Sequence, residues 1–485
     1  MPPLCPQETL SSLQSMSEDC LFITVYAPRL TTRTSPKRMP LIAWVHGGSF
    51  IQGGSTNYGL DGSFLAHQNG MVVVVIQYRL GLLGFLKTSA SQTQTSLSGN
   101  YAVKDVMMAL SFIKEIAPAF GADRQSLTLA GQSSGADMIK TLLVIESAAE
   151  LFDQAILHSS PLNYGDQSIN TADKIGAMAL SLFNQSSDSL RNLPVERILE
   201  VQTDLMAQIP QAIPGVAFSE PFRPVIDNTL IKNDFIYAIN HPQNSSLFVK
   251  NRNIILTTVR DEAAPTISSA FNDLTSSQQL PVAIESALGT AASSRFVDIQ
   301  ASGVYSRELR MEAFFDHNET KALKDTLSVF GTDYIWRCAN QQVAVNLTRN
   351  YPSSNGKGFV WLAEFDLGIP YTSSQAIPYC RGKVCHEDDI LPLFGIPSDY
   401  NMTISFSERK LMAEVGRRWG AFVTDGSPNS KGYINWPPVS SDKRLNMLRL
   451  GGICSKIDET QRPWACSEAV GLWGRKVPFD AQIYT

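Results

Sequence analysis

Short, continuous apolar runs recur along the chain, and they constrain its fold more than any other feature of the sequence. Such runs are typical of parallel strands that helices cover on both faces of a sheet. Stretches with helical spacing of apolar residues accompany them, at Lys104–Ile116, Ala136–Leu151 and Glu408–Thr424. This alternation implies right-handed crossovers and predicts an α/β fold with a doubly wound, mostly parallel central sheet flanked by helices. The expected strands are Leu41–Val45, Val72–Tyr78, Leu127–Ala130, Ala155–His158, Ile254–Val259, Phe359–Phe365 and Leu445–Leu450.

The composition excludes several classes of protein. The 485 residues are 44% apolar and 18% charged, so a large core is expected and global disorder is excluded. With a net charge of −5 and no large basic patch, we expect no nucleic-acid partner. The longest apolar stretch, Met71–Ile76, is far shorter than the ~20 residues that cross a bilayer, so no membrane span is predicted. No repeat or linker divides the chain, which predicts a single domain over residues 1–485.

Seven cysteines leave two interpretations open. Cys5 and Cys20, Cys380 and Cys385, and Cys454 and Cys466 are close in sequence, and Cys338 is left over. This paired spacing favours disulfides and an oxidising compartment, whereas the alternative is buried free thiols in a cytosolic enzyme. No C-x-x-C is present, so neither a zinc site nor a thioredoxin-like site is expected. Five glycosylation sequons add little, because a chain this rich in Ser and Thr carries roughly three or four by chance; they begin at Asn184, Asn244, Asn318, Asn346 and Asn401.

The strongest catalytic signal is Gly131-Gln132-Ser133-Ser134-Gly135, which fits the pattern G-x-S-x-G. An apolar strand precedes it and a helical stretch follows it, which is the context of a nucleophile elbow rather than of an ordinary Gly-rich turn. Such an elbow exposes the serine hydroxyl beside a helix N-terminus, where developing negative charge is favoured.

A second signal is His46-Gly47-Gly48-Ser49-Phe50, directly after the strand Leu41–Val45. Lipases and esterases take oxyanion-binding N–H groups from an HGGG-type loop and from the residue after the nucleophile. A plain turn at the end of a strand would not predict this loop together with a downstream G-x-S-x-G.

A serine nucleophile also needs a base and an acid that orients the base. Among six histidines, His386 stands out because it follows Cys385 in a loop after a core strand. Asp261-Glu262 comes where the strand Ile254–Val259 ends, and active sites of open α/β sheets form at the carboxyl ends of strands. The order Ser133, Glu262, His386 is the nucleophile, acid, base order of α/β-hydrolases.

In these motifs the chain resembles the type-B carboxylesterases, the cholinesterase-like branch of the α/β-hydrolase fold. It is most similar to the fungal secreted esterases and lipases. The resemblance covers nearly the whole chain. It rests on the three motif regions above and on Ser17-Glu18-Asp19-Cys20-Leu21, Gln77-Tyr78-Arg79-Leu80-Gly81, Gly99-Asn100, Cys385-His386, the late helix through Trp419, and Gly426-Ser427-Pro428-Asn429.

The resemblance implies a serine hydrolase of carboxylic esters, secreted and glycosylated, with a small-molecule ester as substrate and neither cofactor nor metal. It implies Ser133 as nucleophile, Glu262 as acid and His386 as base. The implied oxyanion hole consists of the backbone N–H groups of Gly48, Ser49 and Ser134, and Cys5–Cys20 is the implied early disulfide. Members usually have several dozen residues before the Cys5 region, so we expect this chain to lack the family's N-terminal strands. No signal peptide is predicted at Met1–Gln7, which has neither a basic nor an apolar segment.

Four positions depart from the family pattern. Gln132 replaces the usual Glu, Ser134 the commoner Ala, and Ala263 the Gly after Asp261-Glu262. Ser49 takes the place of a third glycine, and its backbone donor is kept if its φ is negative. No catalytic group is lost. Two other readings stay open: an acyltransferase that passes the acyl group to an alcohol, and a non-catalytic binding relative, although such relatives typically lose a triad member.

Overall fold

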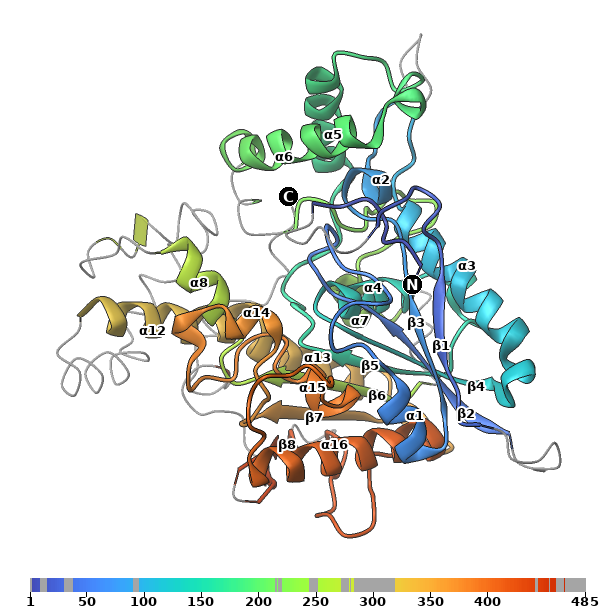
Figure 1. The fold of residues 1–485 in the computed structure, drawn as a ribbon, viewed down its shortest axis with the longest axis vertical. Coiled ribbons are helices and arrows are strands. Elements are labelled where there is room, and N and C mark those ends of the chain that lie inside the picture. Colours follow the sequence, from blue (N-terminus) through green and yellow to red (C-terminus); the bar gives the residue numbers. More distant parts are fainter. Residues whose placement is uncertain are drawn as a thin grey trace.

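A single mixed sheet of nine strands organises the part of the chain that the computed structural model describes. The described residues are 2–8, 15–29, 38–89, 96–213, 216, 220–243, 252–271, 279, 281–282, 319–440, 444–452, 454–458 and 466. The strand order is β1-β3-β2-β4-β5-β6-β7-β8-β9, and only the two edge strands run antiparallel to their neighbours (Figure 1). The strands are β1 Ile23–Tyr26, β2 Met39–Val45, β3 Val72–Ile76, β4 Ala122–Gln132, β5 Gln154–His158, β6 Ile254–Val259, β7 Val360–Phe365, β8 Met447–Leu450 and β9 Lys456–Asp458.

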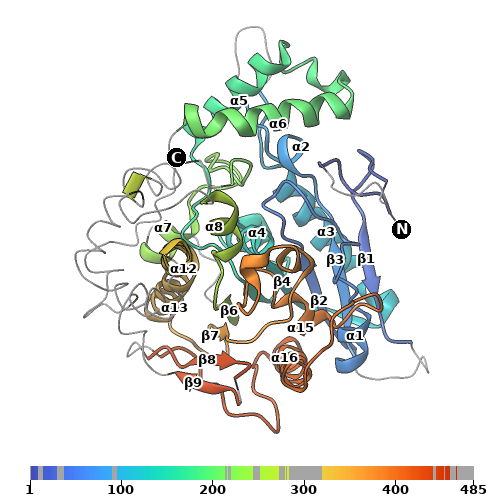
Figure 2. The same cartoon turned by 60° about the vertical axis from the view of Figure 1, so that its left-hand side comes forward.

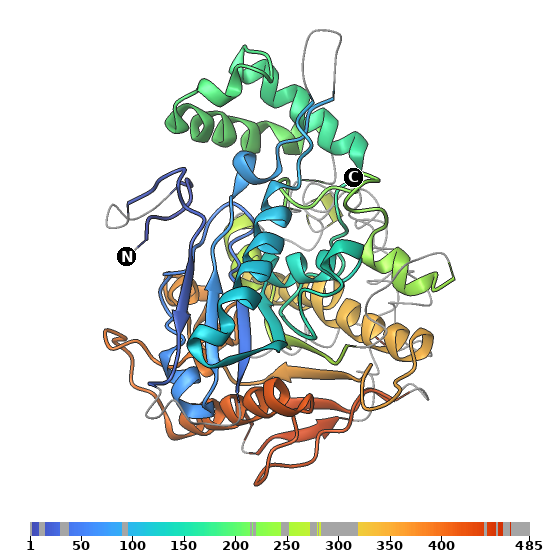
Figure 3. The same cartoon turned by 90° about the vertical axis from the view of Figure 1, so that its right-hand side faces the viewer.

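Helices cover both faces of this sheet and bury two apolar cores. Alternate residues of β2 point to opposite sides, so that Leu41 and Ala43 enter one core and Ile42 and Trp44 enter the other. In Figures 1 and 3, β7 lies between α13 on one face and α16 on the other. The helices are α1 Ser63–Asn69, α2 Gly81–Phe85, α3 Tyr101–Ile116, α4 Ser134–Leu142, α5 Ile169–Phe183, α6 Val195–Ala212, α7 Phe235–Asn240, α8 Ala264–Ala270, α12 Glu319–Gly331, α13 Cys338–Asn350, α14 Thr372–Gln375, α15 Ile390–Phe394 and α16 Phe406–Asp425.

Two groups of helices lie outside the layers that cover the sheet. Helices α5 and α6 pack against each other at one end of the molecule, as Figures 2 and 3 show. Helix α8 contacts α12, and a π-helical turn, Thr332–Arg337, connects α12 to α13. Helix α8 starts shortly after the carboxyl end of β6, and its contact with α12 therefore places both helices beside that edge of the sheet.

All seven expected strands are present, and so are the helices expected at Lys104–Ile116 and Glu408–Thr424. The helix expected at Ala136–Leu151 is wrong in its second half, because α4 ends at Leu142. Ile145 is extended, with φ −91° and ψ 120°, and a short 3-10 turn follows. Ile145 and Ala148 are nevertheless buried, so the apolar spacing reflects core contacts made from a turn rather than from a helix.

Three disulfides form within the described residues, and one of them corrects a sequence expectation. Cys5–Cys20 and Cys380–Cys385 pair as expected. Cys454 and Cys466 do not pair: Cys466 bonds to Cys338, 128 residues away in sequence, and Cys454 is an exposed free thiol. Proximity in sequence failed here because Cys338, the first residue of α13, meets Cys466 in the folded chain. Among the helices described, none is long and apolar enough to span a bilayer.

Candidate active site

Ser133 stands on a strained turn between β4 and α4. Its φ of 56° and ψ of −128° lie in a region that L-residues rarely adopt, and its backbone N–H donates to His158 O at 2.9 Å. The flanking Gly131 and Gly135 are required because neighbouring backbone atoms leave no room for a side chain at either position. A Cβ on Gly135 would lie 2.2 Å from Val45 O, and one on Gly131 would lie 2.8 Å from the Gly135 carbonyl. The predicted nucleophile elbow is therefore present.

The loop after β2 approaches this elbow closely. A Cβ on Gly47 would lie 3.1 Å from Ser133 Cβ, and one on Gly48, whose φ is +111°, would lie 2.2 Å from Gln52 O. The loop is tied to α4 by the Phe50 N–H, which donates to the Ser134 hydroxyl at 3.2 Å. The N–H groups of Gly48 and Ser49 meet no acceptor among the described residues.

From the sequence we expect the Ser49 backbone N–H to remain available as a donor if φ of Ser49 is negative. In the structure, Ser49 does not have this negative φ. Its φ is +54°, and Phe50 follows with +58°, because the chain turns tightly here and Gly48 O accepts from both Ile51 N and Gln52 N. The left-handed conformation costs about 1–2 kcal/mol for a non-glycine residue. It nonetheless leaves the Ser49 N–H without an acceptor among the described residues, so the condition was stricter than the geometry requires.

Glu262 and His386, the residues expected to act as acid and base, lie in contact in the site. Glu262 Oε2 lies 2.6 Å from His386 Nδ1, and the Glu262 side chain is fully buried. The neighbouring Asp261 points elsewhere, since its carboxylate accepts from the Val384 N–H at 2.8 Å and from Arg260 Nε at 2.9 Å. Of the two adjacent carboxylates, Glu262 is the one that contacts the histidine.

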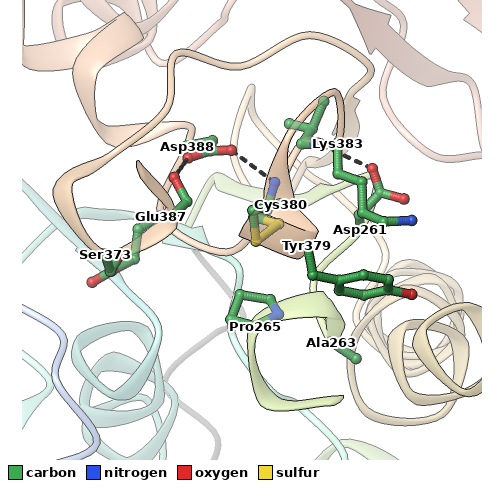
Figure 4. The surroundings of a disulfide bond; sticks show 12 residues. Asp261, Ala263, Pro265, Ser373, Tyr379, Cys380, Lys383, Glu387 and Asp388 are labelled. Carbon is green, nitrogen blue, oxygen red and sulfur yellow. Dashed lines mark hydrogen bonds between the residues drawn. A yellow bond between two sulfur atoms is a disulfide. The ribbon is translucent and has the colours of Figure 1, made fainter. Parts of the chain in front are cut away.

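The loop that presents His386 is held on both sides. The Cys380–Cys385 disulfide ends one residue before the histidine. Asp388 and Asp261 lie on opposite sides of this disulfide in Figure 4. Asp388 accepts the Cys385 N–H at 2.8 Å with one oxygen and the Tyr371 N–H at 2.8 Å with the other. Glu387 also receives a hydrogen bond from Ser373. These contacts fix the backbone around His386 before any substrate arrives.

A buried polar chain that the sequence did not reveal lies beneath this loop. Trp419 Nε1 donates to His158 Nε2 at 2.8 Å, and His158 Nδ1 lies 2.7 Å from Asp389 Oδ2. Because Nε2 accepts, Nδ1 carries the proton and donates to the carboxylate. These hydrogen bonds connect α16 to β5 and to the residues after His386. His158 therefore has a structural role and does not line the cavity.

His386 is electrostatically poised as a strong base. Burial disfavours its imidazolium form, but the hydrogen bond to Glu262 and the charges of Glu262, Glu387 and Asp389 outweigh burial and raise the pKa of His386 to about 9. His46 shows the opposite behaviour, because burial lowers its pKa to about 4. Its ring is stacked on Tyr78 and its Nδ1 lies against Gly47 O, so His46 shapes the loop instead.

Ser133 and His386 share the cavity without a hydrogen bond between them. His386 Nε2 lies 3.2 Å from the Gln132 side-chain nitrogen, at the position where the family usually has Glu. With Nδ1–H directed at Glu262, Nε2 is the acceptor and the Gln132 amide is the donor. Such catalytic contacts are often loose in the absence of substrate and tighten in the complex.

The three residues open into one cavity of about 230 Å³. Its far wall comes from α8, α12 and the π-helical turn, and it is mainly apolar, with Phe271, Leu327, Phe330, Ile335 and Trp336. Ala263, which replaces the usual glycine, fits because Gly331 faces it: a Cβ on Gly331 would lie 2.8 Å from Ala263 Cβ.

Apolar lining residues were hard to identify from the sequence. Five aromatic residues are candidate lining residues from the sequence alone: Phe50, Tyr58, Phe218, Phe222 and Phe330. Phe330 lines the cavity, Tyr58 lines a neighbouring one, and Phe50 and Phe222 belong to the core. Phe218 lies outside the described residues. Sequence reasoning missed Trp336, whose ring centroid is 5.6 Å from that of His386, and Glu220, because no local motif surrounds either residue.

Comparison with known proteins identifies the family and the fold of the chain. The model of the carboxylesterase family matches residues 1–463. Carboxylesterase 4A of Bos taurus is 27% identical to the chain, covering 92% of the chain and 80% of the relative, and para-nitrobenzyl esterase of Bacillus subtilis is 26% identical over 92% and 83%. A solved structure of a PNB esterase superposes with a TM-score of 0.70 at 24% identity, covering 95% of this chain and 86% of that one, which supports the α/β-hydrolase fold. The expected closeness to fungal enzymes stays a prediction. The chain belongs to the carboxylesterase family and is a serine hydrolase that cleaves carboxylic esters.

Proposed function

We propose that Ser133, His386 and Glu262 form the catalytic triad of this esterase. The observation that carries the proposal is the 2.6 Å contact between Glu262 and His386 Nδ1 in the cavity that Ser133 lines. His386 Nε2 takes the proton of the Ser133 hydroxyl as the oxygen attacks the ester carbonyl carbon. The imidazolium then protonates the leaving alcohol, which leaves an acyl group on Ser133. Water, deprotonated by the same nitrogen, hydrolyses this acyl-enzyme and restores the hydroxyl.

In this proposal the backbone N–H groups of Gly48, Ser49 and Ser134 bind the oxyanion. Support comes from two features of these donors. The N–H groups of Gly48 and Ser49 have no acceptor among the described residues, and Ser134 is the first residue of α4, where N–H groups have no partner within the helix. Donors fixed in this way stabilise charge that develops in the transition state, typically by about 3 kcal/mol each.

A fluorophosphonate probe tests the nucleophile. One label per chain is expected, on the peptide that contains Ser133, and Ser133→Ala should lose both the label and the esterase activity. Ser111→Ala is a matched control, because Ser111 lies on the exposed face of α3 and donates only to Met107 O. Labelling that persists in Ser133→Ala would reassign the nucleophile.

We also propose that the protein is secreted and glycosylated. Support comes from the three disulfides, which persist in oxidising compartments. Asn184 and Asn401 are exposed, whereas the Asn346 amide is engaged with Asn240 at 2.8 Å. Mass spectrometry of the protein from a eukaryotic secretory host should find glycans on Asn184 and Asn401 and none on Asn346.

A further inference from the structure

The wall of the cavity beside the oxyanion loop contains an acidic residue that the proposed triad does not use. Glu220 lines the cavity together with Gly48, Ser49 and Ser133, and it is only 8% exposed. The Ser49 side chain is among the groups that act on its carboxyl group, and it lowers the pKa of Glu220. Its Oε2 atom is buried and makes no hydrogen bond to any residue that the structure describes.

Leaving a buried carboxyl group incompletely hydrogen-bonded is unfavourable, so a cavity that contains one together with Ser133 favours a ligand that can hydrogen-bond to it. An alkyl chain placed against Glu220 offers its carboxyl group no hydrogen bond, whereas a hydroxyl group offers one. The wall formed by α8, α12 and Thr332–Arg337 is mainly apolar, whereas Glu220 gives another part of the cavity an acidic group.

The charged groups around Glu220 decide its protonation. Burial and the charge of Asp137 raise the pKa of Glu220 to about 8, against the opposing influence of Arg223, Lys140 and the Ser49 hydroxyl. The phenols of Tyr78 and Tyr164 are also within electrostatic reach. Glu220 is thus largely a neutral acid at pH 7, which both donates and accepts hydrogen bonds and does not select for a cation.

We propose that Glu220 is a specificity-determining residue that hydrogen-bonds to a hydroxyl group on the acid or the alcohol part of the ester. The natural substrates are then hydroxylated esters rather than simple alkyl esters. This inference rests on the proposed function, because it assigns the polar wall of the cavity in which Ser133 acts. Ser49 lines the same cavity as Glu220, and its N–H is one of the proposed oxyanion donors.

Isosteric ester pairs test the proposal. Ethyl 3-hydroxybutanoate against ethyl 3-methylbutanoate probes the acid part, and 2-hydroxyethyl butanoate against propyl butanoate probes the alcohol part. After correction for the rates of alkaline hydrolysis, the wild type should favour the hydroxylated member of one pair by about tenfold in kcat/KM, the worth of one hydrogen bond to a buried partner. The pair that responds identifies the part of the ester that Glu220 contacts. No preference in either pair overturns the proposal.

Variants sharpen the result. Glu220→Leu should abolish the preference, whereas Glu220→Gln, which keeps a donor and an acceptor at the same place, should retain most of it. Glu146→Leu, an exposed glutamate outside this cavity, is the matched control and should leave the preference unchanged. The wild type could instead prefer butanoylcholine, the choline ester, over 3,3-dimethylbutyl butanoate and lose this preference in Glu220→Gln. That result would show a carboxylate that binds cations and would contradict the proposal.

The two proposals fail in distinguishable ways. Fluorophosphonate labelling of Ser133 in each variant reports whether the nucleophile is intact and whether the variant is folded. If Ser133→Ala retains activity on these esters, the proposed function fails. If Ser133 is labelled and required but the isosteric pairs react equally, only the role of Glu220 fails.

Discussion

Glu262 contacts His386 Nδ1 through Oε2 at 2.6 Å, while its other oxygen, Oε1, accepts the Val259 N–H at 2.8 Å. The carboxylate is therefore held at the end of β6 by the backbone of the same strand. With one oxygen fixed, the other meets the imidazole in a single orientation. The strand itself sets the geometry of the contact between Glu262 and His386.

This relationship predicts different outcomes for two adjacent carboxylates. Glu262→Gln should lower kcat by orders of magnitude, because an amide can donate to Nδ1 and so favours the wrong tautomer of His386. Asp261→Asn, the matched control, should be mild, because Asp261 contacts Arg260 and the Val384 N–H rather than the histidine. Steady-state kinetics with a chromogenic ester measures both. A large loss in Asp261→Asn with a small one in Glu262→Gln would reassign the acid.

The raised pKa of His386 predicts the pH dependence of the reaction. The base must be neutral, and its pKa of about 9 means that kcat/KM should climb between pH 7 and 9 and level off above that range. Glu387→Gln removes one of the negative charges that raise this pKa, so the midpoint should move to lower pH. Glu146→Gln, far from the cavity, should not move it. A profile already flat at pH 7 would contradict the assignment.

The same shift has a consequence for stability. A histidine whose pKa is raised on folding, from 6.5 to about 9, stabilises the folded state fully below pH 6.5. This contribution is lost as the pH rises through 9. Stability and activity therefore change in opposite directions over this interval.

Trp419 and Trp436 allow a controlled test of the buried hydrogen bonds that join Trp419, His158 and Asp389. Both are fully buried, but Trp419 Nε1 donates to His158 whereas Trp436 Nε1 has no partner in the described part of the chain. Replacement by Phe removes similar volume at both positions. Trp419→Phe additionally leaves His158 Nε2 unsatisfied, so it should lower the free energy of unfolding by about 1–2 kcal/mol more than Trp436→Phe. Urea titrations measure the free energy of unfolding of both variants. Equal losses in the two variants would show that the hydrogen bond from Trp419 to His158 contributes nothing to stability.

The sequence predicted the interior of this molecule better than its edges. Parallel strands such as β3, Val72–Ile76, are apolar throughout because both faces are covered, and this pattern is local. The edge strands β1 and β9 are partly exposed, contain only four and three residues, and have no such pattern. The polar first half of β4, from Ala122 to Ser126, was missed for the same reason.

The candidate site divides in the same way. Ser133, Gly48 and Ser49 are set by short motifs, since a strained turn and a close backbone approach demand particular residues at fixed spacing. Glu220 and Trp336 reach the cavity from segments far away in sequence, and no local rule requires either of them. Cys338–Cys466 is a tertiary pairing of the same kind, and adjacency in sequence pointed to the wrong partner.

The cysteine pairing is open to a direct chemical test. Alkylation of the denatured, unreduced protein should modify one cysteine, Cys454, because the other six are in disulfides. Peptide mapping without reductant should find the Cys338 peptide linked to that of Cys466. Alkylation after reduction, which should modify all seven, is the control. A label on Cys338 would instead support the pairing of Cys454 with Cys466.

The two disulfides in the second half of the chain should differ in their effect on stability and activity. In the chain-entropy view, the stabilisation by a disulfide grows with the length of the loop that it closes. A separation of 128 residues for Cys338–Cys466 then corresponds to roughly 5 kcal/mol, and a separation of 5 for Cys380–Cys385 to roughly 2 kcal/mol. The double variant Cys338→Ser/Cys466→Ser should therefore unfold at much lower denaturant concentration than Cys380→Ser/Cys385→Ser. The variant Cys380→Ser/Cys385→Ser should lose little stability but much of its kcat, because its disulfide ends one residue before His386. Denaturant titrations and kcat of both variants give the comparison, and a stable variant without Cys338–Cys466 would show that this long-range link is dispensable.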